Sequence, residues 1–276
     1  MSDKSFLFVG GNPRSGTGAL SQLLNMHPEI YIGRERFRKK FADGTLDASF
    51  FERENFIDPT FTLKRNALPK VSAMSEEQIN TRREVQAAKF DQAKYIGDKY
   101  PSIARTFPWL WDRFPGAKVV YIVRNPISVA ESYEQRNSNP DDSFKRDARD
   151  ALNSWNASVA DVVSALDAGR DIVVVSYELL FRKRRHMKQL FSALGLTTDG
   201  LSQKRMQGFA DYAQGVSSKP APKDDMLRRT IFLEANLDAY RQLVNNHCIL
   251  AAATKADSQT STSEALVDAS MESDLG

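Results

Sequence analysis

The first residues of this chain that could do chemistry form a glycine-rich loop, Gly11-Asn-Pro-Arg-Ser-Gly16. The loop follows the apolar run 5–10 and precedes residues 19–26, whose apolar spacing predicts a helix. Backbone N–H groups in such a loop, together with the positive end of the helix, can enclose a phosphate group. The sequence therefore predicts a phosphate ligand here, and a glycine turn with a purely structural role is the alternative.

The residues after Gly16 separate two kinds of phosphate chemistry. An ATP-binding loop normally continues with lysine and then serine or threonine, which serve the terminal phosphates and magnesium. Here Thr17 and Gly18 follow, and the basic residue Arg14 lies inside the loop. Transfer of a sulfuryl group can be supported by positioned side-chain donors without a metal. The loop favours that chemistry, with no metal site predicted; a P-loop kinase using ATP and a nucleotide- or polyanion-binding protein without turnover remain alternatives.

A second candidate anion site comes from Arg124 and Ser132, eight residues apart. Arg124 directly follows the apolar run 119–123, which predicts a buried strand, and Ser132 lies two turns into the helix predicted after it. An arginine at the carboxyl end of a parallel strand and a hydroxyl on the next helix can converge on one anion. The alternative is an arginine that ends a strand and a small residue that packs a helix.

The elements around these residues alternate between strand and helix. Strands are predicted at 5–10, 29–33, 94–99, 119–123 and 171–177, and helices at 19–26, 75–94, 101–114 (interrupted by Pro108), 126–137, 145–169 and 186–196. Ser75 and Gln78 have the spacing of a capping box. This order predicts an α/β, P-loop-like three-layer fold, in which helices flank a mostly parallel central sheet.

Composition and charge indicate one globular domain with an anionic ligand. The chain has 276 residues, of which 41% are hydrophobic and 26% charged, so residues 1–250 are expected to form a single domain. Residues 251–276 have a net charge of −4 and read as a flexible acidic tail, which leaves about +7 on the rest. One cysteine and no membrane-length apolar run favour a cytoplasmic protein without a membrane or nucleic-acid partner.

The segment PRSGTGAL at 13–20 resembles the 5'-phosphosulfate loop of sulfotransferases that use 3'-phosphoadenosine 5'-phosphosulfate (PAPS). It departs from that pattern at Gly18, where the family generally has a second hydroxyl residue. The Arg124 and Ser132 pair resembles the family's 3'-phosphate site, and VVSYELL at 174–180 resembles a strand that ends near the nucleotide. The resemblance implies that the donor PAPS, which leaves as adenosine 3',5'-bisphosphate, is bound by Arg14, Ser15, Gly16, Thr17, Gly18, Ala19, Arg124, Ser132 and Tyr177, with a core tyrosine as the alternative for Tyr177. The segment SSKPAPK at 217–223 is expected to cover the 3'-phosphate with Lys219 as donor, and a plain linker is the alternative.

The same resemblance implies catalytic roles for three residues. Glu35, in the segment IGRERF, resembles the glutamate base of Golgi-type and bacterial members, and Lys99 resembles a lysine of glycan and protein-tyrosine sulfotransferases. Arg14 would contact the sulfuryl group, so that Arg14 and Lys99 stabilise negative charge on the departing nucleotide. A surface ion pair is the alternative role for Glu35. Because the histidine base of cytosolic aryl and steroid sulfotransferases has no counterpart, we expect the acceptor hydroxyl or amine to belong to a glycan or glycosylated small molecule.

Overall fold

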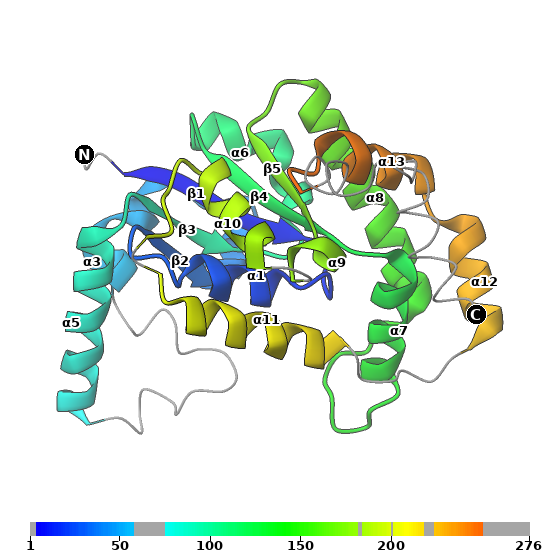
Figure 1. Ribbon diagram of the computed structural model, residues 1–276, viewed down its shortest axis with the longest axis horizontal. Coiled ribbons are helices and arrows are strands. Elements are labelled where there is room, and N and C mark those ends of the chain that lie inside the picture. Colours follow the sequence, from blue (N-terminus) through cyan, green and yellow to red (C-terminus); the bar gives the residue numbers. More distant parts are fainter. Residues whose placement is uncertain (1–3, 58–74, 182–183, 200, 218–223, 251–276) are drawn as a thin grey trace.

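A fully parallel sheet forms the centre of the molecule (Figure 1). The computed structural model describes residues 4–57, 75–181, 184–199, 201–217 and 224–250. The five strands lie in the order β2-β3-β1-β4-β5, each parallel to its neighbours. They are β1 (Ser5–Gly11), β2 (Ile30–Arg34), β3 (Tyr95–Lys99), β4 (Lys118–Val123) and β5 (Ile172–Ser176). The predicted α/β fold with a mostly parallel sheet is confirmed.

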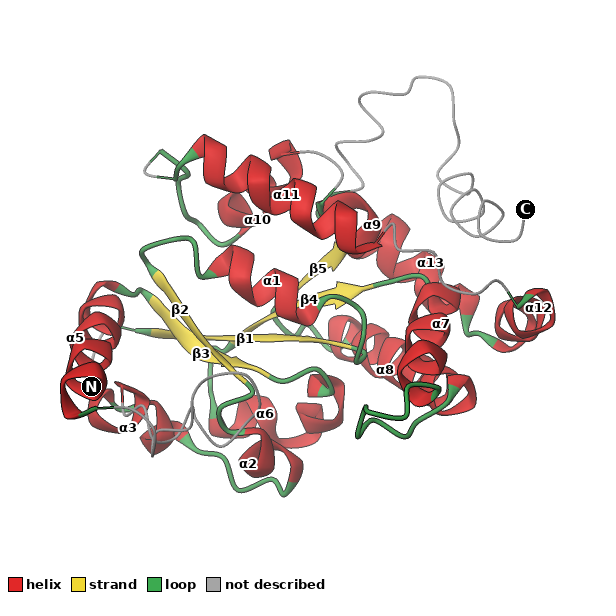
Figure 2. Ribbon diagram, turned by 90° about the horizontal axis from the view of Figure 1, so that it is seen from below, coloured by secondary structure: helices red, strands yellow, loops and turns green. Residues whose placement is uncertain are grey.

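Helices cover both faces of this sheet. In Figure 2, α1 and α11 lie on one face, and α6 and α8 lie on the other. The helices with the closest bearing on the site are α1 (Thr17–Leu24), α2 (Arg38–Ala42), α6 (Phe107–Arg113), α7 (Pro126–Asn137), α8 (Ala148–Asp167) and α9 (Tyr177–Leu180). The others are α3 (Arg53–Ile57), α5 (Glu76–Gln92), α10 (Arg184–Ala193), α11 (Gln203–Ser217), α12 (Asp225–Glu234) and α13 (Leu237–Gln242), with short 3₁₀ or π turns η1 (Ala48–Phe51), η3 (Ile103–Thr106) and η4 (Leu243–His247).

Burial on both faces explains the apolar runs of the central strands. Residues 119–123 of β4 are all buried, as are all five residues of β5. Parallel strands covered by helices on each side lack a solvent face, so they carry no alternation of polar and apolar residues. Because all five strands run the same way, their carboxyl ends meet at one edge, where the chain segments after β1, β2, β3, β4 and β5 begin.

Two local sequence signals for helix starts had different outcomes. The predicted capping box is present, since the Ser75 hydroxyl accepts from Gln78 N and the Gln78 side chain accepts from Ser75 N. Pro108, expected to interrupt a helix over 101–114, lies instead in the first turn of α6, after the separate 3₁₀ turn η3. The first turn of a helix tolerates proline because its N–H groups have no partner inside the helix.

The long helices of the described residues are amphipathic or polar. None of them is both long enough and apolar enough to cross a lipid bilayer. The predicted acidic tail at 251–276 lies outside the described residues.

Candidate active site

The loop between β1 and α1 needs glycine at both of its ends. A Cβ atom on Gly11 would lie 2.4 Å from the carbonyl oxygen of Ile122 on β4. At the other end, Gly16 has φ 91°, and a Cβ there would lie 2.4 Å from Cδ2 of Tyr177. Glycine is the residue that adopts such a backbone conformation without a steric cost. The two glycines therefore let the loop lie tightly between its neighbours in the sheet and the Tyr177 ring.

The loop presents donors suited to an anion. Ser15 is fully buried, and its hydroxyl has no hydrogen-bond partner in the structure. Helix α1 begins two residues after Ser15, at Thr17, and Gly16 at the N-cap supplies no side-chain acceptor for the first N–H groups. A buried hydroxyl without a partner is costly unless a ligand completes it. These features fit the phosphate or phosphosulfate group that the sequence predicted for Arg14, Ser15, Gly16, Thr17, Gly18 and Ala19.

Arg14 joins this loop to the second predicted anion site. Its Nε donates to Oγ of Ser132 on α7 at 2.9 Å, and Nη1 of Arg124 donates to the Arg14 carbonyl oxygen at 3.1 Å. Arg14 itself has φ 74°, an uncommon conformation for a residue with a side chain. Residues that are more than a hundred positions apart in sequence therefore meet at the carboxyl edge of β1 and β4.

The guanidinium groups around Ser132 are close enough to affect one another. Burial lowers the pKa of Arg14, and the positive charges of Arg136 and Arg124 lower it further. Arg136 was not among the predicted site residues, although its spacing of four from Ser132 places both on one face of α7. Asp142 accepts from Nε and Nη2 of Arg136, each at 2.6 Å, and the guanidinium lies over the Phe144 ring. Because Asp142 pairs with Arg136, the groups here that are placed to hold an anion are the Arg14 and Arg124 guanidinium groups and the Ser132 hydroxyl.

Tyr177 connects the two halves of this region. The guanidinium of Arg124 lies over its ring, 4.4 Å from the ring centroid, and Gly16 packs against ring carbons Cδ2 and Cε2. The backbone of Arg124 is fixed by Trp155, whose Nε1 donates to its carbonyl oxygen at 2.9 Å. In the next residue, Asn125 N donates to the Glu178 carboxylate at 2.9 Å. The Tyr-Glu pair that follows β5 thus supports both the glycine-rich loop and the Arg124 turn.

The predicted catalytic pair lies at the ends of β2 and β3. Lys99 Nζ lies 2.6 Å from Glu35 Oε1, with the lysine side chain 9% exposed and the glutamate side chain 27% exposed. Arg38 Nη1 lies 3.9 Å from the other carboxylate oxygen. Glu35 has φ 59°, and its N–H donates to the Lys99 carbonyl oxygen at 3.0 Å. Glu35 is thus paired both with Lys99, the other predicted catalytic residue, and with the exposed Arg38, which agrees with the alternative reading of Glu35 as an ion-pair residue as well as with a catalytic role.

Asp98, next to Lys99, was missed by sequence reasoning. It is fully buried at the end of β3 and accepts hydrogen bonds from the N–H groups of Phe37 and Lys99. Burial raises the pKa of its carboxyl to about 6, against the opposing effect of those hydrogen bonds. An acidic residue inside a short strand that precedes a predicted catalytic lysine, as in KYIGDK, is the sequence signal that could have revealed it.

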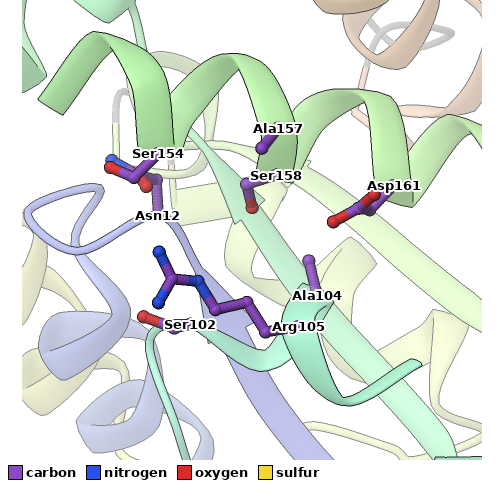
Figure 3. A pocket seen from close by; sticks show the side chains of 8 residues that line it. All are labelled: Asn12, Ser102, Ala104, Arg105, Ser154, Ala157, Ser158 and Asp161. Atoms are coloured by element: carbon purple, nitrogen blue, oxygen red, sulfur yellow. The ribbon is translucent and has the colours of Figure 1, made fainter. Parts of the chain in front are cut away.

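A small polar pocket opens between α8 and the segment that follows β3. Figure 3 shows the Arg105 side chain extending below α8 towards Asn12, with Asp161 at the other end. Its lining residues are Asn12, Ser102, Ala104, Arg105, Ser154, Ala157, Ser158 and Asp161. Burial raises the pKa of Asp161, opposed by the charge of Arg105. Asn12 begins the glycine-rich loop, so this pocket lies beside the loop, on the sheet face that carries α8.

One predicted donor-binding residue cannot be located in the structure, and the described residues can also be searched for a metal site. Of the segment 217–223 that was predicted to cover the 3'-phosphate, residues 218–223, including Lys219, lie outside the described residues. Among the described residues, no three His, Cys, Asp or Glu side chains are grouped so that they could hold a metal ion.

The fold and the site together define a family. The model described as "Sulfotransferase family" matches residues 7–200, well over half of the chain, so this chain belongs to the sulfotransferase family. The matched range contains the glycine-rich loop, Glu35, Lys99 and the Arg124 region.

Among named relatives, the chain is similar to protein-tyrosine sulfotransferases. It is 24% identical to protein-tyrosine sulfotransferase A of Caenorhabditis elegans over 202 residues, covering 70% of this chain and 50% of the relative. It is 23% identical to protein-tyrosine sulfotransferase 1 of Danio rerio over 246 residues, covering 84% and 65%. The chain thus spans between half and two thirds of the length of these two relatives.

A solved structure supports the fold. The sulfotransferase domain of the Synechococcus PCC 7002 olefin synthase aligns with a TM-score of 0.50 at 19% identity, covering 86% of this chain and 96% of that domain.

Proposed function

We propose that this protein transfers a sulfuryl group from PAPS to an acceptor hydroxyl. The observation that carries the proposal is the meeting of the two predicted phosphate sites, through the Arg14 contacts with Ser132 and Arg124. The 5' and 3' phosphates of one adenosine nucleotide lie within a single ribose of each other, so sites for both must be neighbours. Family membership supports PAPS as the donor.

In this proposal the loop and the arginine cluster hold the donor. The N–H groups at the start of α1 and the Ser15 hydroxyl bind the 5'-phosphosulfate end, while Arg124 and Ser132 bind the 3'-phosphate. Arg136 lies one helical turn beyond Ser132, where Asp142 pairs with its charge. PAPS supplies an activated sulfuryl group, whose bond to the 5'-phosphate oxygen breaks as the bond to the acceptor oxygen forms.

Glu35, Lys99 and Arg14 act on the reacting atoms. The Glu35 carboxylate accepts the proton of the acceptor hydroxyl, and the charges of Lys99 and Arg14 stabilise the 5'-phosphate oxygen that receives the electron pair. Lys99 Nζ lies 2.6 Å from Glu35 Oε1, so the lysine also orients the carboxylate. The products are the sulfated acceptor and adenosine 3',5'-bisphosphate.

The acceptor class is the part of the function that experiment must decide. The two relatives are named protein-tyrosine sulfotransferases, which supports a tyrosyl hydroxyl as the acceptor. The sequence instead predicted a glycan or a glycosylated small molecule. Incubation with PAPS and a panel of tyrosine peptides, oligosaccharides and small phenols, followed by mass spectrometry, separates these classes. Calorimetry with adenosine 3',5'-bisphosphate and with Mg·ATP is run in parallel.

Each outcome of this experiment has one meaning. Sulfated product together with binding of the bisphosphate supports the proposal. Binding without product from any acceptor class favours a nucleotide-binding protein without turnover. Phosphate transfer from Mg·ATP would replace the proposal with a kinase.

A further inference from the structure

We propose that Asp98 is a positioning residue, which holds the turn carrying Glu35 so that the Glu35 carboxylate stands against Lys99. This inference rests on the proposed function, in which Glu35 accepts the acceptor proton. Asp98 touches neither predicted phosphate site, and the reaction described above does not use it.

Asp98 lies on β3 beside the end of β2, where the turn that carries Glu35 begins. Strands β2 and β3 pair in register with Gly33 opposite Asp98 and Arg34 opposite Lys99. A Cβ atom on Gly33 would lie 2.7 Å from Oδ1 of Asp98, so the carboxylate fills the space over that glycine. The end of β2 therefore approaches the carboxylate closely because residue 33 has no side chain.

The hydrogen bonds of Asp98 go to the segments that carry the catalytic pair. Oδ2 accepts from Phe37 N at 2.8 Å and Oδ1 from Lys99 N at 2.9 Å. The backbone N–H of Arg36 also donates to this carboxylate. The Asp98 side chain thus binds Arg36 and Phe37, which follow Glu35, and also Lys99, which forms the ion pair with Glu35.

The conformation of Glu35 needs such support. Its φ of 59° is uncommon for a residue with a side chain and persists where the surroundings hold it in place. On one side, Glu35 N donates to the Lys99 carbonyl oxygen at 3.0 Å. On the other side, the hydrogen bonds from Arg36 and Phe37 to Asp98 fix the chain as it leaves Glu35. A buried carboxylate is costly unless it is hydrogen-bonded, and here its bonds determine the direction of the Glu35 side chain.

The decisive experiment is a double-mutant cycle between Asp98→Asn and Glu35→Gln. Turnover is measured with the acceptor that reacts fastest in the panel above, and donor-site integrity with adenosine 3',5'-bisphosphate by calorimetry. We expect Asp98→Asn to lower kcat at least about tenfold while the bisphosphate affinity stays within about twofold. In the Glu35→Gln background, Asp98→Asn should have no further effect on kcat, because the group that it positions is already neutral. Additive effects of the two substitutions would overturn the inference.

A second measurement does not depend on turnover. Amide hydrogen exchange of the ligand-free protein should be faster over residues 33–41 in Asp98→Asn and unchanged over the loop 11–16 and residues 124–132. Unaltered exchange at 33–41 would overturn the inference whatever the kinetics show. Asp147→Asn is the matched control, since Asp147 also accepts a backbone N–H, at the start of α8, and it should leave both measurements unchanged.

A further variant guards against loss of folding. If Asp98→Asn does not fold, Gly33→Ala displaces the same carboxylate without removing it, and it should lower kcat with the bisphosphate affinity kept. Full activity of Gly33→Ala would then overturn the inference. Failure of the wild-type protein to bind the bisphosphate would instead overturn the proposed function, while the exchange data still decide whether Asp98 holds the turn.

Discussion

Nε of Arg14 donates to Oγ of Ser132 at 2.9 Å, so the glycine-rich loop after β1 and helix α7 after β4 are already in contact without a ligand. Two side chains expected at opposite ends of one nucleotide thus bind each other. Under the proposed function, the 3'-phosphate of the donor inserts among Arg14, Ser132 and Arg124, where charge-assisted hydrogen bonds replace the one between Arg14 and Ser132.

Removal of the Arg124 guanidinium should weaken nucleotide binding. We expect Arg124→Ala to reduce the affinity for adenosine 3',5'-bisphosphate by about 1.5–3 kcal/mol, the range for a charge-assisted phosphate contact. Calorimetry measures this change. Arg149→Ala is the control, because Arg149 is an exposed arginine paired with Glu234, and it should bind the ligand as the wild type does. Equal affinities for all three proteins would remove Arg124 from the donor site.

Neutralisation of Glu35 should separate chemistry from binding. In Glu35→Gln, turnover is expected to fall by about a hundredfold or more, as is typical for loss of a general base, while the bisphosphate affinity changes little. Initial rates at saturating PAPS, with the bisphosphate Kd as the parallel measurement, test this. A rate equal to that of the wild type would move the base to another residue.

Substitution by alanine should change protein stability differently at Gly16, in the loop, and at Gly18, in α1. Gly16→Ala places Cβ 2.4 Å from the Tyr177 ring at φ 91°, so we expect a loss of stability of about 1–3 kcal/mol and weaker bisphosphate binding. Gly18 has nothing within 4 Å of the added carbon and lies in α1, so Gly18→Ala should fold with at least wild-type stability. Urea denaturation compares them, and equal stabilities would contradict the described loop.

Gly18→Thr extends this comparison to binding. It introduces the hydroxyl that the family loop generally carries, into space that the structure leaves open. We expect tighter bisphosphate binding than in Gly18→Ala, by roughly one hydrogen bond to a charged group, about 1.5–3 kcal/mol. Identical affinities of the two variants, measured by calorimetry, would show that the 5'-phosphate does not reach residue 18.

The pH dependence of stability should reveal Asp98. Burial raises the pKa of its carboxyl from the ordinary 3.8 to about 6, so the folded protein binds this proton more tightly than the unfolded chain. The contribution of Asp98 to stability therefore increases as the pH falls from about 6 towards 3.8, and it is lost as the pH rises through about 6. The slope is at most about 1.4 kcal/mol per pH unit.

Urea denaturation of the wild type and Asp98→Asn between pH 7 and pH 4 measures this slope. The difference in unfolding free energy between them should shift in favour of the wild type as the pH falls. A constant difference over this range would contradict the raised pKa.

The sequence predicted the sheet well because strong local patterns specify it. Runs such as 119–123 and 172–176 are apolar throughout, and the glycine-rich loop occurs directly between a strand and a helix. These signals depend on residues that are close in sequence, so they can be recognised before the three-dimensional structure is known.

Contacts between distant segments were harder to predict. The role of Asp98 depends on the register of β2 against β3, which brings Gly33 and Phe37 to it from some sixty positions away. Arg136 was missed because its i, i+4 relation to Ser132 gains meaning only once Arg14 is known to reach α7. Pro108 was misplaced because a proline within a helical pattern signals a start or a break equally, and the turn η3 before it decides between them.

The strand order divides the candidate site into two halves. Strands β4 and β5, on one side of β1, carry Arg124 and Tyr177, whereas β3 and β2, on the other side, carry Lys99 and Glu35. Under the proposed function, the donor is held by the loop after β1 and by the segments after β4 and β5, whereas the acceptor meets the segment that follows β2. Exchange of residues 29–57 with those of a relative should therefore change which acceptor is used and leave binding of the donor intact. Acceptor specificity can then change while the donor-binding residues stay the same.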